Sequence, residues 1–181
     1  MSFKTVSDSE VTLTELMIPS YANFGGKVHG GIILSLMDKV AYVCASKHTG
    51  AYCVTANVSG VSFMAPVEVG DLVSLFASVN YVGTTSLMVG IKVVTENFKN
   101  QSVKHTNTSY FTFVALDDEG KPKKIPGLKL QNEVEIRRFV EGKLRKEYHQ
   151  KNNKEFERIK KDCDNKVRIQ ILKNENCSVV E

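Results

Sequence analysis

Residues 23–38 read NFGGKVHGGIILSLMD, and the rest of the chain can be interpreted outward from them. After the HGG tripeptide at 29–31 the sequence stays largely apolar to residue 45, which is typical of a helix buried on nearly every side. Asp38 lies in the middle of this helix, with apolar side chains one turn away on either side. An unpaired carboxylate among such neighbours is costly, so Asp38 requires a partner or a function.

The segments around this helix predict an α+β fold. The helix is expected over residues 30–48, closed by Gly50, and a short alternating strand is expected over 11–17. Four longer segments rich in Val, Thr, Phe and Tyr predict strands at 52–66, 71–82, 85–98 and 102–116. Their short connectors, which carry Pro, Gly and Asn, predict antiparallel neighbours joined in a meander. The long strands would curl around the helix and bury one face on it.

The last third of the chain has a different character. Residues 1–120 carry 7 Lys and Arg against 10 Asp and Glu, whereas residues 121–181 carry 17 against 10. The composition changes over the Pro- and Gly-containing segment 117–129, so we predict one domain at 1–131 and a charged helical extension at 132–181. Acidic residues alternate with the basic ones, which favours a solvated helix over a nucleic-acid-binding surface.

Neither a signal peptide nor a membrane span is expected, because acidic residues interrupt the N-terminus and no segment approaches about 18 apolar residues. The cysteines form neither a CxxC pair nor a metal-ligand spacing; they are Cys44, Cys53, Cys163 and Cys177. We therefore predict a soluble cytoplasmic protein with reduced thiols, no metal and no organic cofactor. The stretch VRIQIL at 167–172 alternates like a strand, but its surroundings are polar and its role stays open.

With these elements in order, the sequence resembles the hotdog-fold acyl-CoA thioesterases over residues 10–128. The resemblance rests on Asn23 before the HGG tripeptide, Asp38 within the helix, and three later phrases, PVEVGD at 66–71, GTTS at 83–86 and GKP at 120–122. It implies a hotdog fold, in which an antiparallel sheet wraps around one long helix, and hydrolysis of acyl-CoA to free acid and CoA. It also implies homodimers, which often assemble into trimers of dimers, that is, hexamers.

The glycine-rich start of the helix offers a site for a carbonyl oxygen. Backbone N–H groups and partial positive charge gather at a helix N-terminus, and Gly30 and Gly31 leave room for close approach. We therefore predict an oxyanion site at these glycines. The alternative is that the two glycines only permit a tight entry into the helix.

Asp38 is the predicted base that activates water, or else the nucleophile that attacks the thioester directly. The sequence does not separate these two roles. The structural alternative is a buried carboxylate that bridges to a neighbouring element. The position of Asp38 within the resemblance favours chemistry over this alternative.

Helix geometry predicts that two subunits build each site. Eight residues at about 1.5 Å each place Asp38 roughly 12 Å along the axis from Gly30, too far for one carbonyl group to meet both. One chain would supply Asn23 and its helix start, and the opposing chain would supply Asp38. Asn23 would hydrogen-bond the water or the carbonyl, with a plain turn residue as the alternative. His29 could act as a catalytic base or contact the substrate. The alternative is a backbone contact, which is more common for a histidine just before a helix start, and no Ser or Cys nucleophile lies near it in sequence.

Coenzyme A is long and anionic, so its nucleotide end should meet backbone amides, hydroxyls and cations. The resemblance and these residue types together indicate the turn Gly83, Thr84, Thr85 and Ser86 and the lysines Lys121, Lys123 and Lys124. The acyl and pantetheine path would be lined by Val58, Phe63 and Met64. Taken alone, a polar hairpin, a solvated loop and ordinary core residues would explain the same positions.

Two other functions compete with hydrolysis. A hotdog protein that binds acyl-CoA as a sensor or regulator would not cleave it, but such a protein has no need of Asn23 together with Asp38. A hotdog dehydratase requires a histidine presented with an acid toward a 3-hydroxyacyl chain, and neither His29 nor His48 lies in such a pattern.

Overall fold

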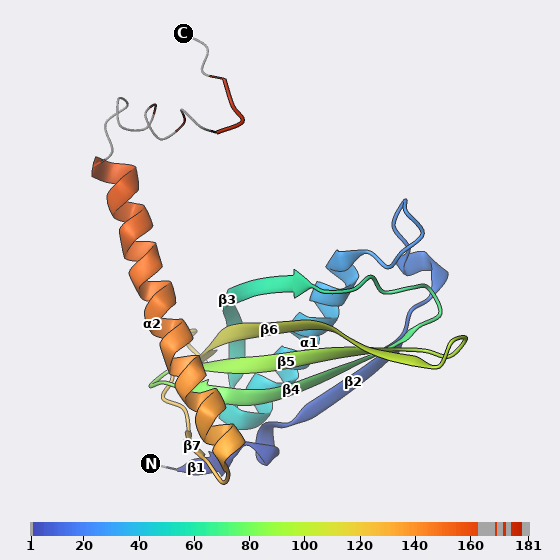
Figure 1. Cartoon of the computed structure of the whole chain (residues 1–181). Helices are drawn as coiled ribbons and strands as arrows, with labels where there is room; N and C mark the ends of the chain where they lie inside the picture. The colour runs from blue at the N-terminus through green and yellow to red at the C-terminus, as the bar shows by residue number, and fades with distance from the viewer. Residues whose placement is uncertain (1, 163–168, 170–171, 173–174, 179–181) are drawn as a thin grey trace. The chain divides into compact units, whose positions relative to one another are not determined.

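The computed structural model describes residues 2–162, 169, 172 and 175–178, and it has the expected α+β architecture (Figure 1). The strands are β1 (Phe3–Thr5), β2 (Val11–Leu16), β3 (Tyr52–Phe63), β4 (Leu72–Val82), β5 (Ser86–Asn97), β6 (Ser102–Leu116) and β7 (Gly127–Lys129). The helices are α1 (Gly30–Thr49) and α2 (Glu133–Asp162), with short 3-10 turns at Ser7–Ser9 and Pro19–Tyr21.

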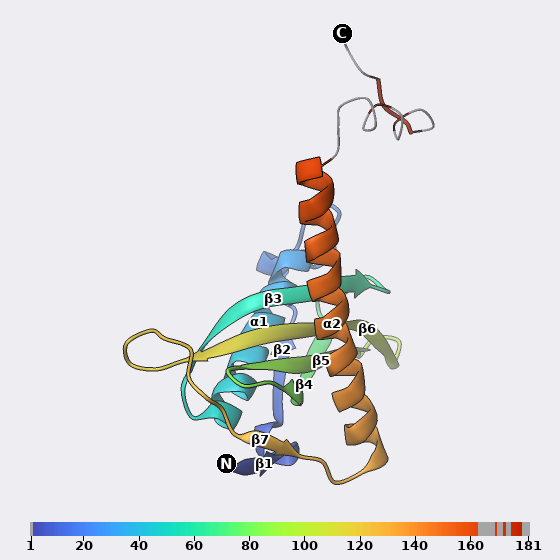
Figure 2. The ribbon, with the colours of Figure 1, turned by 90° about the vertical axis from the view of Figure 1, so that its left-hand side faces the viewer.

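One antiparallel sheet of five strands carries the fold, in the order β2-β4-β5-β6-β3. Helix α1 lies across one face of this sheet (Figures 1 and 2). Strand β1 pairs in parallel with β7 in a small second sheet. The core between helix and sheet includes the fully buried side chains of Met37, Val40, Leu75, Ile91 and Phe113. This is the predicted sheet wrapped around one long helix.

The predicted meander is wrong at one connection. Strand β3 lies at the edge of the sheet beside β6, whereas β4 lies between β2 and β5. Residues 64–71, which we call the crossover, therefore link the edge strand β3 to β4, the neighbour of the other edge strand β2. They do not form a hairpin. The crossover ends beside β2 because Asp71 and Gly70 exchange backbone hydrogen bonds with Met17, and Gly70 adopts a φ of 91° there. Pro66 and Gly70 signal a turn but do not specify which strands it joins.

The composition predicted that helix α1 is buried on nearly every side, and this prediction is wrong for the single chain. One face is packed on the sheet, but Tyr42 and Val43 are 38% and 46% exposed in the single chain. The helix ends follow the predicted signals. His29 is the N-cap, and Gly50 closes the helix in the left-handed conformation with φ 63°.

Helix α2 starts close to the predicted beginning of the extension. The chain divides into two compact units, Met1–Gly142 and Lys143–Glu181. Within the first unit α2 packs on Tyr81, whose ring centroid lies 5.0 Å from that of Phe139. Within the second unit the helix exposes the apolar side chains of Leu144, Tyr148, Phe156 and Ile159. The predicted domain boundary at 131/132 stays a prediction, and most of the strand-like stretch 167–172 lies outside the described residues.

Other findings concern membranes and thiols. Among the described residues, no helix combines the length and the apolar character that a membrane span needs.

Cys44, Cys53 and Cys177 are free thiols, and Cys163 lies outside the described residues. Burial raises the pKa of the Cys44 thiol to about 12, and it also raises the pKa of Cys53. These two thiols are therefore protonated near neutral pH and act as small packing groups.

His48 predicts a pH dependence of stability. Its ring is fully buried near the end of α1, Nε2 lies 3.1 Å from the Pro126 carbonyl oxygen, and Nδ1 has no hydrogen-bond partner among the described residues. Burial lowers the pKa of His48 below 6.5, although the Pro126 carbonyl and Asp8 oppose this. The unfolded chain therefore binds a proton more readily, so the melting temperature should fall as the pH is lowered from about 6.5.

The variant His48→Gln should lose this component, and its melting temperature should decline less between pH 7 and pH 5 than that of the wild type. His149→Gln, on the exposed side of α2, serves as the matched control. Equal declines in wild type and His48→Gln would contradict the assignment to His48.

Candidate active site

The loop before α1 is a tight turn built by Asn23. Its Oδ1 accepts hydrogen bonds from the N–H groups of Gly25 and Lys27 at 2.9 and 3.2 Å, and Gly26 takes a φ of 74°. Asn23 is exposed, and its Nδ2 has no partner within the described residues. The side chain therefore shapes the loop through its oxygen, and its Nδ2 donors are not used in this turn.

The start of α1 divides its backbone donors between protein and solvent. His29 Nδ1 accepts the N–H of Gly31 at 2.9 Å, so this histidine contacts the backbone. The N–H of Gly30, the first residue of the helix, has no partner within the helix, as in any first turn. Gly30 is thus the better placed of the two glycines to donate to a ligand.

Phe63 lies against this helix start. A Cβ atom on Gly30 would lie 3.2 Å from Cζ of the Phe63 ring, so any larger residue at position 30 would press on the ring. Val58, Phe63 and Met64 are 42%, 50% and 56% exposed, along β3 and just beyond it. The three predicted path residues are therefore not core residues of the single chain, and the structure brings one of them to the predicted oxyanion site.

Asp38 has a partner that the sequence did not indicate. Its Oδ1 accepts the hydroxyl of Thr55 at 2.8 Å, from strand β3. The sequence predicted a carboxylate enclosed by apolar neighbours, but the Asp38 side chain is only half-buried. Thr55 is 17 residues away in sequence, and no local motif marks it, because the contact depends on how β3 packs beside α1.

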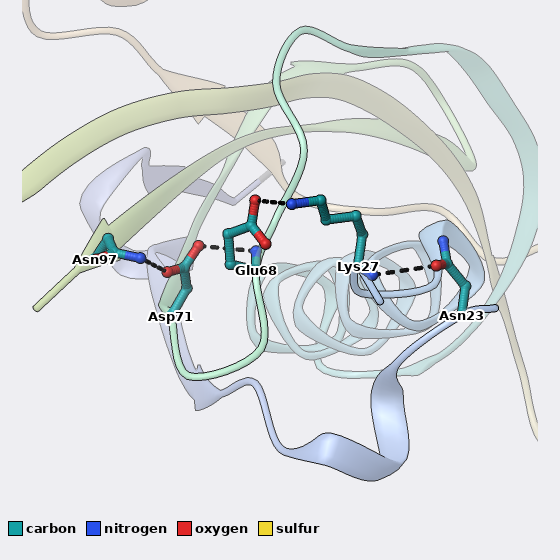
Figure 3. A network of polar contacts seen from close by, with 5 residues as sticks. All are labelled: Asn23, Lys27, Glu68, Asp71 and Asn97. Carbon is teal, nitrogen blue, oxygen red and sulfur yellow. Dashed lines mark hydrogen bonds and ion pairs between the residues drawn. The ribbon is translucent and has the colours of Figure 1, made fainter. Parts of the chain in front are cut away.

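A polar network braces the Asn23 loop (Figure 3). Lys27 forms an ion pair with Glu68 on the crossover, and the two backbones also meet in an isolated bridge. Asp71, only 3% exposed, accepts the N–H of Glu68 at 2.9 Å and Nδ2 of Asn97 at 2.5 Å. The loop is thereby tied to the crossover, and the crossover to the end of β5.

The predicted CoA residues are neighbours in space. The N–H of Gly83 donates to Ser86 at 2.7 Å, and the Thr84 carbonyl accepts the N–H of Ile125 at 3.1 Å. Lys121 and Lys123 lie four and two residues before Ile125 and are exposed, with Lys121 paired to Glu119. The β4–β5 turn and the lysine segment therefore lie side by side. Among the described residues, no three His, Cys, Asp or Glu side chains cluster as metal ligands.

An antiparallel sheet around one long helix with a glycine-rich start defines a hotdog-fold protein. Comparisons with known proteins identify the family within this fold. The model of the thioesterase superfamily matches residues 25–99. VdlD of Helicobacter pylori is 45% identical over 79% of this chain and 82% of its own length. The uncharacterized acyl-CoA thioester hydrolase YkhA of Bacillus subtilis is 35% identical over 71% of this chain and 75% of its own. The chain belongs to the hotdog-fold acyl-CoA thioesterase family.

Solved structures agree with this assignment. An acyl-CoA hydrolase of Staphylococcus aureus, in complex with butyryl-CoA and CoA, has a TM-score of 0.80 and 32% identity over 88% of this chain and 97% of its own. A hexameric acyl-CoA thioesterase has a TM-score of 0.81 and 33% identity over 84% of this chain and 98% of its own.

Variants of the S. aureus hydrolase have also been solved, with alanine in place of one asparagine, one aspartate or one threonine. That aspartate follows that asparagine by 15 residues, and the threonine follows by a further 17. Asn23, Asp38 and Thr55 have the same spacing here.

Asp71 provides a test of the bracing network. In Asp71→Asn, one of the two donors that meet the carboxylate would face an NH2 group, so a buried donor loses its acceptor. The free energy of unfolding should fall by about 1–3 kcal/mol, measured by chemical denaturation. Lys27→Met, which removes an exposed ion pair, should change it by about 1 kcal/mol or less. Equal effects of the two substitutions would show that Asp71 does not anchor the crossover.

Proposed function

We propose that this chain hydrolyses the thioester of acyl-CoA to a free acid and CoA, in a site shared by two subunits. One subunit supplies Asn23 and the N–H of Gly30, and the other supplies Asp38 with Thr55. The observation that carries the proposal is the hydrogen bond from Thr55 to Asp38, made between residues whose spacing matches the positions varied in the S. aureus hydrolase.

The thioester carbonyl would lie at the start of α1. Its oxygen gains negative charge in the transition state, and in this proposal it accepts hydrogen bonds from the N–H of Gly30 and from Nδ2 of Asn23. Gly31 contributes space and its bond to His29, not a free N–H. The Phe63 ring forms an apolar wall beside Gly30, which strengthens hydrogen bonding by excluding water.

Asp38 would act as base or nucleophile. As a base, it takes a proton from water while the hydroxide attacks the carbonyl carbon, and the C–S bond breaks as CoA leaves as a thiol. As a nucleophile, its oxygen attacks the carbonyl carbon and the C–S bond breaks, so that CoA leaves as a thiolate and a mixed anhydride remains. Water then hydrolyses this anhydride, which releases the acid, restores the Asp38 carboxylate and provides the proton that the thiolate takes up. Thr55 holds Oδ1 and so orients the carboxylate, leaving Oδ2 toward the reacting atoms.

The exposed edge of the sheet supports the dimer. Among the described strands, β3 is paired on one side only, by β6, so its other edge would offer backbone donors and acceptors to a second β3. Apolar side chains are exposed along β3, just beyond it and on α1, namely Tyr52, Val58, Phe63, Met64, Tyr42 and Val43. Such a surface favours association. By analogy with the hexameric thioesterase, we propose that dimers assemble into a trimer of dimers.

The nucleotide end of CoA would bind at the β4–β5 turn. Exposed Thr84, the backbone of Thr85 and the side chains of Lys121 and Lys123 offer hydroxyl, amide and cationic groups at one place. CoA enters as part of the substrate and leaves as product, and the mechanism calls on no further cofactor.

Release of free thiol from acyl-CoAs of graded chain length tests the reaction. Asp38→Asn should lower kcat by about 10²–10⁴-fold, because the reaction loses either the base that activates water or the nucleophile that attacks the carbonyl carbon. Thr55→Val should lower kcat less and leave KM nearly unchanged. Lys39→Gln, on the exposed side of α1, is the matched control. Binding of acyl-CoA without thiol release by the wild type at any chain length would favour a sensor instead.

Mixed dimers test the shared site. Neither Asn23→Ala nor Asp38→Ala chains should be active alone, but a dimer of one of each has one intact site of two. Random mixing should therefore restore about one quarter of wild-type activity, since half of the dimers are mixed. Native mass spectrometry would verify exchange, and exchanged dimers without activity would indicate a site within one chain.

A further inference from the structure

Asn107 on β6 is a buried polar side chain that the proposed reaction does not use. It is 0% exposed, and its Nδ2 donates to the carbonyl oxygen of Ser62 at 3.0 Å. Its Oδ1 is buried and has no hydrogen-bond partner within the part of the chain that the structure describes. An apolar side chain at this position would avoid the cost of desolvating Oδ1, so the buried amide calls for an explanation.

The bond from Asn107 lies where β3 departs from regular pairing. The register of β3 on β6 shifts between Ser59 and Ser62, and we call residues 59–62 the β3 bulge. On the first side of the bulge, Ser109 Oγ donates to the Ser59 carbonyl at 2.8 Å. On the second side, Asn107 donates to Ser62. Side chains of β6 thus hold both ends of the bulge where regular pairing is interrupted.

Phe63 lies directly after the bulge. Phe63 follows Ser62 directly and lies opposite Asn107 in the β3–β6 register. Its ring reaches the start of α1, where a Cβ on Gly30 would lie 3.2 Å from Cζ. Because a bulge re-aims the side chains beside it, a shift of Ser62 would move this ring.

We infer that Asn107 is a positioning residue that acts through Phe63. By fixing Ser62, it holds the aromatic ring over Gly30 and keeps water away from the N–H that receives the carbonyl oxygen. The inference rests on the proposed function for its effect on catalysis, but the placement of the ring can be measured without any substrate. Asn107 itself does not meet the substrate.

Kinetics of Asn107→Leu give the first test. Leucine matches the shape of asparagine but cannot donate to Ser62, so kcat should fall by about tenfold to a hundredfold while KM changes little. Asn80→Leu is the matched control, since Asn80 is also buried in the sheet, at 7% exposed, and bonds to Ser78. Asn80→Leu should alter the melting temperature and leave kcat unchanged. Equal losses of kcat in both variants would overturn the inference.

A double-mutant cycle with Phe63→Ala tests the route. If Asn107 acts through the ring, Asn107→Leu should lower kcat no further once the ring is absent. A full additional loss in the Phe63→Ala background would show that Asn107 acts elsewhere. Absence of thiol release by the wild type would instead refute the proposed function, and the inference would then be decided by fluorescence.

The chain contains no tryptophan, so Phe63→Trp introduces a single tryptophan at the ring position, whose emission can be excited selectively over that of the tyrosines. Adding Asn107→Leu should shift its emission to longer wavelength, because the ring leaves Gly30 for solvent, whereas adding Asn80→Leu should not. Asn107→Ser, whose hydroxyl is too short to reach Ser62, provides a second variant if the leucine variant does not fold. Unchanged emission in a folded Asn107 variant would overturn the inference.

Discussion

Helix α1 must bury an apolar face and still present polar groups at its start and its middle. The sheet meets both requirements because it covers only one side of the helix and ends at β3. Asp38 therefore lies half-buried at the edge, where Thr55 can reach it, instead of deep in the core. The position at which the sheet stops thus determines which part of the helix stays accessible.

Polar side chains hold the irregular backbone around this edge. Asp71 and Asn107 are almost completely buried, and each binds a backbone group where the chain departs from regular pairing. Asp71 fixes the crossover against which the Asn23 loop docks, and Asn107 fixes the bulge that directs Phe63. Buried hydrogen bonds are directional, so they specify one geometry where apolar contacts would tolerate several. The apolar cluster between α1 and the sheet supplies most of the buried hydrophobic surface.

Much of the fold could be predicted because its signals are local. Helix α1 is recognisable from its apolar run and its glycines, and four of the strand segments from their composition and turns. The order of strands in the sheet could not be predicted in the same way. The crossover contains the same Pro and Gly signals as a hairpin, and only the pairing of β4 with β2, beside α1, excludes the hairpin.

The sequence by itself determined the elements, the helix caps and the candidate residues Asn23, Gly30 and Asp38, since each depends on neighbours within a turn or a loop. Only the tertiary structure decided their partners. Thr55 meets Asp38 across 17 residues, and Phe63 reaches Gly30 from the far end of β3. Such contacts follow from packing between distant segments, which local periodicity does not encode. The sequence therefore predicted the candidate residues, and the tertiary structure decided which distant side chains lie beside them.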